Sequence, residues 1–380
     1  MFEPADIYLD YAAATPKRAE VAALHEQRCA RFFANPHGTG RHSTDCRHAG
    51  EKAAAEILEL LDIPADEADL YWTSGGTEAA NLAILGGMPG QRHKFAAVTA
   101  TAHACLLEPA QRWGADKSMR LPVREDGQID LEKCTSADRG QTGMVGVCHV
   151  NNETGVRHDL GDIRRWMDAT CPAAVLLVDA LQSAGRMPVP WRDARIDMLT
   201  IGGRKLGGPA GLGALIVRRG LTVAPLLFGG GQQGAVRPGT VDVVGALELA
   251  HAVRLAVLRR GEELRHAKDL NSRLRAGLAG LAHGPCRIVS PSNASPWILC
   301  TAFEGYEGAI LTRLLGGRGI AVSAGSACSA DADETSHVLR AMGIADEEAR
   351  GMLRISTGHD TTRAEIDHFI EELARVLEEY

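Results

Sequence analysis

The chain has 380 residues, which allows two domains of ordinary size and excludes a small disulfide scaffold. Hydrophobic residues make up 45% and charged residues 23%, as in folded water-soluble proteins. The 41 basic and 48 acidic residues give a net charge of -7, which supplies no basic field for a nucleic-acid backbone. We therefore expect a globular protein with no direct nucleic-acid ligand.

The cysteines and the N-terminus indicate a cellular compartment. The nine cysteines are odd in number and contain no CxxC pair, so neither a disulfide framework nor a metal site is expected. The acidic N-terminus lacks the basic start and apolar run of a signal peptide, and no stretch of about 18 apolar residues occurs. These features predict a cytoplasmic protein without a membrane anchor.

In chain order, short apolar runs first alternate with segments of helical period, which is the pattern of a parallel sheet covered by helices. Strands are expected at 70–73, 94–99, 143–149, 174–179, 197–201 and 213–217, and helices at 51–61, 77–85, 106–113 and 162–169. Two long helices, 241–259 and 262–281, follow. Beyond them we expect strands at 287–289, 298–303, 320–322 and 353–355, with helices at 307–315, 336–342 and 362–379. The pattern predicts an α/β domain followed by a small α+β domain.

A lysine and an aspartate carry the first chemical signal. Lys205 lies between two apolar runs in a glycine-dense loop, where desolvation would make its amine a usable nucleophile, although a loop lysine that reaches solvent would look the same. Asp179 ends an apolar strand, and a buried carboxylate needs a cationic partner such as the ring nitrogen of pyridoxal phosphate. Capping or a salt bridge would explain Asp179 alone, but both residues together favour the cofactor.

The turn from 73 to 78 is a candidate phosphate site. It runs from a strand through Gly75, Gly76 and Thr77 into an alanine-rich helix, whose free N–H groups would face an anion. A plain N-cap turn is the alternative.

These residues resemble, over essentially the whole chain, the NifS-like cysteine desulfurases of the class V aminotransferase group of pyridoxal phosphate enzymes. The motifs that carry the resemblance lie in one order along the chain: 8–16, 35–36, 73–78, 149–155, 178–183, 203–205, 237–240, 323–328 and 353–358.

The resemblance implies the fold-type I architecture of pyridoxal phosphate transferases, with a mainly parallel seven-stranded sheet in the large domain and a small α+β C-terminal domain. Residues 1–15 would be an arm that joins the small domain, 16–250 the large cofactor-binding domain, and 251–380 the small domain with the Cys328 loop. A homodimer is also implied.

The resemblance further implies the site. Lys205 would form the Schiff base, Asp179 pair with the ring nitrogen, His103 stack on the ring, and Asn152 and Gln182 bond its O3' oxygen. Gly76, Thr77 and the neighbouring subunit's copy of Thr240 would hold the phosphate, while Arg354 and Asn35 would bind the substrate carboxylate. Without the resemblance, His103 would be interpreted as a hydrogen-bonded core histidine.

Cys328 lies in a small, polar tract that cannot bury a side chain well, so its thiol should be exposed. A thiolate there can attack a sulfur made electrophilic by the cofactor. The products would be L-alanine from L-cysteine and a persulfide on Cys328, in a loop long enough to hand sulfur directly to an acceptor protein. Cys148, Cys171 and Cys300 are expected to be buried packing.

Three features depart from the family pattern. Gly202-Gly203-Arg204 replaces the usual Ser-Gly-His, and the donors of Arg204 could replace the lost phosphate contacts unless the side chain points to solvent. Cys105 is a second reactive thiol or a packing residue. The chain stops at Tyr380, short of the extension with which the housekeeping bacterial enzymes dock an iron-sulfur scaffold.

The leading hypothesis is therefore an L-cysteine desulfurase. A C–S lyase or selenocysteine lyase without a stored persulfide is one alternative, and a non-catalytic sulfur-assembly partner is another. The acceptor pathway stays open between iron-sulfur cluster assembly, tRNA thiolation, a cofactor and sulfur modification of DNA.

Overall fold

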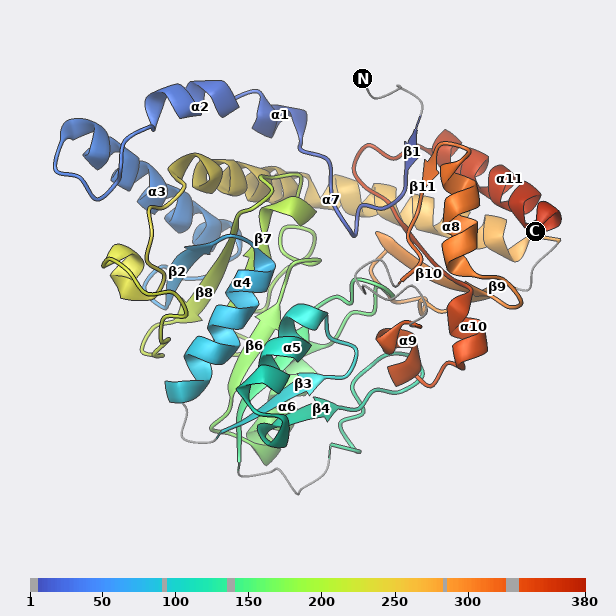
Figure 1. Cartoon of the computed structure of the whole chain (residues 1–380), viewed down its shortest axis with the longest axis horizontal. Coiled ribbons are helices and arrows are strands. Elements are labelled where there is room, and N and C mark those ends of the chain that lie inside the picture. The colour runs from blue at the N-terminus through green and yellow to red at the C-terminus, as the bar shows by residue number, and fades with distance from the viewer. Residues whose placement is uncertain (1–5, 91–93, 135–140, 283–285, 326–334) are drawn as a thin grey trace.

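The computed structural model describes residues 6–90, 94–134, 141–282, 286–325 and 335–380. Figure 1 shows a larger sheet region and a smaller region that share the long helix α7 (Val243–Ala279). The expectation of two helices here was wrong. Gly261 costs only about 1 kcal/mol inside a helix, and α7 packs along both α3 and α11, so the helix continues through it.

The larger region is built on a seven-stranded sheet in the order β2-β8-β7-β6-β5-β3-β4. Only β8 runs antiparallel to its neighbours, so the other strands of this sheet end at one edge. The strands are β2 (Ala68–Thr73), β3 (Phe95–Thr99), β4 (Ser118–Leu121), β5 (Thr142–Cys148), β6 (Val175–Asp179), β7 (Met198–Gly202) and β8 (Gly213–Arg218). The expected strands are confirmed, and only the short edge strand β4 was not anticipated.

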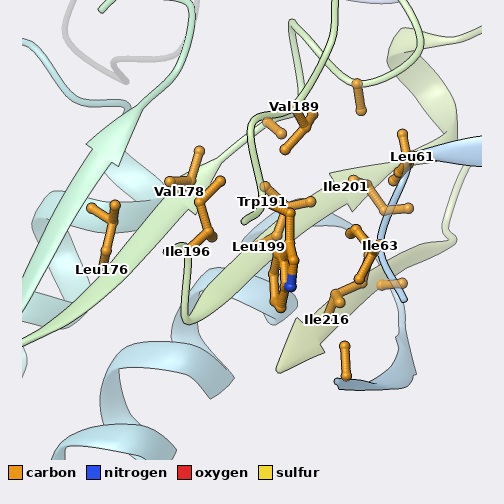
Figure 2. Close-up of a cluster of buried hydrophobic side chains, with 14 of the residues drawn as sticks. Leu61, Ile63, Leu176, Val178, Val189, Trp191, Ile196, Leu199, Ile201 and Ile216 are labelled. Atoms are coloured by element: carbon orange, nitrogen blue, oxygen red, sulfur yellow. The ribbon is translucent and has the colours of Figure 1, made fainter. Parts of the chain in front are cut away.

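Helices cover both faces of this sheet because side chains alternate along its strands. In β6, Val175 and Leu177 pack with α4 and α5, whereas Leu176 and Val178 face the cluster that includes α3, α6 and α7. Figure 2 shows part of this second cluster. The helices of the region are α1 (Ala19–Ala22), α2 (His25–Arg31), α3 (Arg41–Leu60), α4 (Gly76–Asn81), α5 (Ala104–Trp113) and α6 (Leu160–Thr170).

The smaller region holds an antiparallel sheet in the order β12-β10-β9. Its elements are β9 (Cys286–Ile288), β10 (Ile298–Phe303), α8 (Gly308–Gly316), β11 (Ile320–Ala321), α9 (His337–Ala341), α10 (Asp346–Arg350), β12 (Met352–Ser356) and α11 (Arg363–Glu379). The N-terminal strand β1 (Ile7–Tyr8) pairs with β11. We propose that 1–15, 16–250 and 251–380 are the arm and the two domains, in which case the boundary falls inside α7.

Among the described residues, no helix is both long and apolar enough to cross a membrane.

Candidate active site

Polar side chains gather at the carboxyl edge of the parallel strands. Asp179 is the last residue of β6, and Lys205 follows β7 in a short helical turn. His103 and Asn152 come soon after the ends of β3 and β5. Since parallel strands present their carboxyl ends at one edge of a sheet, residues that are distant in the sequence meet there.

Asp179 is buried and surrounded by neutral donors. One oxygen, Oδ1, accepts from the Leu181 N–H at 3.0 Å and the Thr200 hydroxyl at 3.3 Å. The other, Oδ2, accepts from the thiols of Cys105 at 3.7 Å and Cys148 at 3.6 Å. Burial raises the pKa of both thiols well above the ordinary value, so they stay protonated.

Asp179 is only 6% exposed. Within the described ranges, no residue forms an ion pair with it. A buried anion without a cation is unfavourable. The donor set around Asp179 therefore fits a ligand that brings its own positive charge, as a protonated pyridine nitrogen does.

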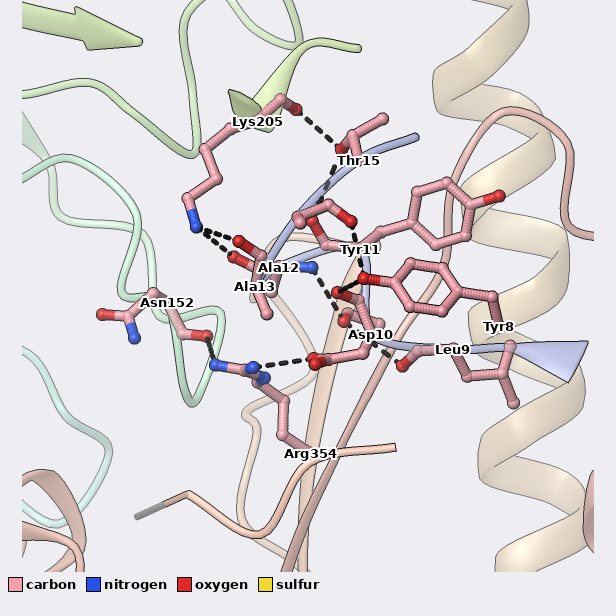
Figure 3. A network of polar contacts seen from close by, with 12 residues as sticks. Tyr8, Leu9, Asp10, Tyr11, Ala12, Ala13, Thr15, Asn152, Lys205 and Arg354 are labelled. Carbon is pink, nitrogen blue, oxygen red and sulfur yellow. Dashed lines mark hydrogen bonds and ion pairs between the residues drawn. The ribbon is translucent and has the colours of Figure 1, made fainter. Parts of the chain in front are cut away.

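The Lys205 amine lies against the N-terminal segment (Figure 3). Its Nζ donates to the carbonyl of Ala12 at 2.9 Å and to that of Ala13 at 2.5 Å. Gln182 donates from Nε2 to the same Ala12 carbonyl at 2.9 Å, and the Thr15 hydroxyl donates to the Lys205 carbonyl at 3.0 Å. Lys205 and Gln182 are thus brought to one place.

His103 is the N-cap of α5, and its Nδ1 accepts from the Cys105 N–H at 3.0 Å. Burial lowers the pKa of its imidazole, with a further lowering by the charges of Lys205 and Arg354 and an opposing effect of Asp179. These charged groups are therefore near enough to His103 to influence its pKa. A neutral ring with Nδ1 already bonded is well suited to lie against an aromatic ligand.

The turn after β2 is tightly packed. Gly75 has a φ of 151°, which favours glycine. A Cβ on Gly76 would lie 2.3 Å from Leu181, and a Cβ on Gly213 would lie 2.7 Å from the Gly75 carbonyl carbon. The main chain therefore approaches its neighbours as closely as only glycine permits, and its N–H groups at the start of α4 are available to an anion.

Arg354 is buried in β12 and held from two sides. Nη2 pairs with Asp10 at 2.7 Å, and Nη1 donates to the carbonyl of Asn152 at 3.1 Å (Figure 3). Its buried Nε has no hydrogen-bond partner among the described residues. An unmet buried donor costs about 1 to 3 kcal/mol, so a carboxylate ligand that reached Nε would be stabilised.

Other expected site residues lie at the surface of the chain. Asn35, Thr77, Arg204 and Thr240 are all exposed. The Asn35 side chain accepts from the His37 N–H, and Arg204 lines a cavity with Lys17, Asp242 and Glu248. The reactive cysteine expected at position 328 lies outside the described residues. Cys148, Cys171 and Cys300 are buried, as expected.

Three neighbours of the site were given no role by the sequence reasoning. Thr200 bonds Asp179, Asp10 pairs with Arg354, and Arg186 donates to the carbonyl of Lys205. Asp10 lies in the motif 8–16, and Arg186 closely follows the motif 178–183. This closeness to a motif is the only feature of the sequence that could have indicated a role for them.

Comparisons with known proteins agree with this geometry. The Aminotransferase class-V family model matches residues 7–369. Cysteine desulfurase 2 of Trichormus variabilis is 34% identical, over 98% of this chain and 93% of the relative. A solved structure titled NifS-like protein has a TM-score of 0.90 at 28% identity and covers 99% of this chain and 100% of its own. A structure titled SspA in complex with cysteine has a TM-score of 0.79 at 27% identity, covering 92% and 98%.

The chain therefore belongs to the class-V aminotransferase family, whose fold-type I architecture was expected and is confirmed. Within that family it is a NifS-like cysteine desulfurase, an enzyme that depends on pyridoxal 5'-phosphate.

Proposed function

We propose that the enzyme converts L-cysteine to L-alanine and keeps the sulfur as a persulfide on Cys328 until an acceptor protein takes it. The observation that carries this proposal is the meeting of Lys205, Asp179 and His103 at one edge of the sheet, with Arg354 close enough to act on His103. The solved relative SspA holds cysteine, which supports the same substrate here.

The cofactor supplies an aldehyde that captures amines and a ring that withdraws electrons from the substrate α-carbon. Lys205 would hold that aldehyde between turnovers and would then move the α-proton. Asp179 would balance the ring-nitrogen charge, and His103 would lie against the ring. Asn152 and Gln182 would bond the ring oxygen, and the turn with Gly76 and Thr77, Arg204 and the partner subunit's Thr240 would hold the phosphate.

Arg354 binds the substrate carboxylate through charge-assisted bonds and is assisted by Asn35. Arg354 thereby fixes the carboxylate end of the substrate and leaves its thiol free for the reaction with Cys328. The thiolate of Cys328 forms an S–S bond to the substrate sulfur while the substrate C–S bond breaks, and the pair of electrons from that bond stays on the carbon side. Protonation of the carbon completes alanine.

We also propose a cytoplasmic homodimer. The described cysteines are all free, which suits a reducing compartment. The exposed Phe228 and Leu227 lie on one loop, and an apolar loop of this kind suits burial against a second copy.

The assignment is tested by two substitutions and one control. Lys205→Ala should fold, lose the visible absorbance of the bound cofactor and form no alanine. Cys328→Ala should keep the absorbance and lose the persulfide, whereas Cys29→Ala, at an exposed cysteine, should behave as wild type. If Cys328→Ala released alanine and sulfide at the wild-type rate, the C–S lyase alternative would be favoured.

A further inference from the structure

Arg186 is a buried guanidinium that contacts two of the residues proposed to bind the cofactor, Gln182 and Lys205. Its Nη2 donates to the Lys205 carbonyl at 2.9 Å and to the Thr15 hydroxyl at 3.4 Å. Its Nη1 donates to Oε1 of Gln182 at 3.3 Å, and the guanidinium lies 5.8 Å from the centre of the Trp297 ring. One side chain thus connects the N-terminal segment, the residues after β6 and the turn after β7.

The charge of Arg186 is not balanced by an ion pair within the part of the chain that the structure describes. None of the described carboxylates forms an ion pair with it, and the nearby Glu263 is engaged by Arg18 at 2.8 Å. Burial lowers the pKa of Arg186 to about 10, which leaves it charged at neutral pH. Keeping an unpaired cation inside a protein is costly, so a hydrophobic residue would be the more stable choice if packing were its task.

The contact with Gln182 fixes the orientation of an amide. Arginine has donors only, so the atom of Gln182 that faces it must be the carbonyl oxygen. The Nε2 group is then turned to the other side, where it donates to the Ala12 carbonyl that also accepts from Lys205. Arg186 therefore determines where the donor of Gln182 points.

Arg186 and Lys205 also line the same enclosed cavity. Its other charged or titratable wall residues are Arg18 and Glu263, which pair with each other, and His359. Burial lowers the pKa of His359, which forms a contact with the exposed Asp360 at 3.1 Å. Arg186 is thus a wall residue whose positive charge has no carboxylate partner among the described residues.

We propose that Arg186 is a positioning residue for the cofactor, because it holds the Gln182 amide and the Lys205 main chain in place and supplies a permanent positive charge behind them. The proposal rests on the function proposed above, in which Lys205 and Gln182 contact the cofactor. A fixed cation disfavours protonation of a group nearby, so it should keep the linkage between Lys205 and the cofactor unprotonated to a lower pH.

The test follows the visible absorbance of the holoenzyme against pH, together with cofactor loss on dialysis. Arg186→Met removes the charge and the donors but keeps the length of the side chain. Arg186→Lys keeps the charge, but its single ammonium group cannot donate to Lys205 and Gln182 in the fixed geometry of a planar guanidinium. Arg275→Met is the matched control, since Arg275 likewise donates to an amide four residues earlier and to main-chain carbonyls, far along α7.

For Arg186→Met we expect the midpoint of the absorbance titration to rise by about one pH unit and the cofactor to dissociate faster. Arg186→Lys should keep the wild-type midpoint and still lose cofactor faster than wild type. Arg275→Met should lower the unfolding temperature without changing either readout.

The proposal is overturned if Arg186→Met titrates as wild type, or if Arg186→Lys retains cofactor as well as wild type does. Cofactor retention in Arg186→Lys tests the proposal even if Arg186→Met does not fold. Failure of the proposed function would look different. In that case wild type and Lys205→Ala would have the same visible spectrum, because no cofactor would be bound through Lys205.

Discussion

Single residues at this site are arranged by partners that do no chemistry themselves. Asp10 and the Asn152 carbonyl hold Arg354, and the Ala12 and Ala13 carbonyls receive the Lys205 amine. Each contact leaves a specific group for the ligand, such as the unpaired Nε of Arg354. The neighbours of each functional residue therefore determine which of its polar atoms can contact a ligand.

Arg354→Ala should raise the KM for cysteine by about 10- to 150-fold, because a charge-assisted bond to a carboxylate is worth roughly 1.5 to 3 kcal/mol. Steady-state kinetics measure this directly. Arg287→Ala is the control, since Arg287 lies in the same small sheet and, among the described residues, its ion pair is with the half-buried Glu348, away from Arg354. An unchanged KM in Arg354→Ala would show that another residue binds the carboxylate.

At positions 202 and 204 this chain has Gly and Arg where the family usually has Ser and His. If the Arg204 guanidinium takes over their phosphate contacts, Arg204→Ala should release cofactor faster than wild type on dialysis. Arg204→His should restore most of the retention, because histidine is the usual residue of the family at this position. Arg204 is exposed in the single chain. Equal retention in wild type and Arg204→Ala would mean that the glycine turn and Thr77 suffice.

Elements contribute to the site through their ends and through the turns that follow. The segment after β5 is one such turn, closed by a bridge between Val150 and Arg157. His149 contacts the Ser183 hydroxyl at 3.0 Å, and Nδ1 of the buried His158 has no partner among the described residues. Burial lowers the pKa of both imidazoles to about 4.

This turn predicts a loss of stability in acid. The unfolded chain binds a proton at each histidine below about pH 6.5, whereas the folded chain does so only near pH 4. Stability is therefore complete above pH 6.5 and falls as the pH drops toward 4. Each histidine should contribute a loss of about 2 kcal/mol between pH 7.5 and 5.

Urea unfolding of wild type and His158→Gln at pH 7.5 and pH 5 measures this effect. The difference between the two pH values should be smaller in the variant, because glutamine does not titrate. A variant with the same pH dependence as wild type would show that His158 is protonated in the folded protein as readily as in the unfolded one.

The whole molecule presents apolar side chains on a loop near the phosphate turn. Phe228 is 90% and Leu227 53% exposed. Further along the same loop, Arg237 pairs with Glu78 of α4 at 2.8 Å, so the loop is tied to the turn that is proposed to receive the phosphate. Association through this loop would link cofactor binding to the dimer.

Phe228→Asp should shift the protein toward monomer and weaken cofactor retention, because a buried aspartate at a subunit interface would be unpaired. Light scattering and dialysis measure the two effects. Leu314→Asp, at an exposed leucine of α8 in the smaller region, should change neither. A Phe228→Asp dimer that keeps its cofactor would place the interface elsewhere.

The sequence alone was sufficient for the alternation of strands and helices, because apolar periodicity and glycine-rich turns are local signals. It also indicated Lys205, Asp179 and the glycine turn, since each stands in a conspicuous local pattern. It predicted a break in α7 at Gly261, where packing along the helix overrides the local preference.

Only the tertiary structure showed which residues support the site. Asp10 and Arg186 lie in or next to motifs and Thr200 lies in a strand, but nothing in their spacing relates them to Arg354, Lys205 or Asp179. They become partners because parallel strands bring their carboxyl ends to one edge and because β1 joins the N-terminal segment to the smaller region. Hydrogen bonds between residues far apart in the chain depend on that arrangement, which no local pattern encodes.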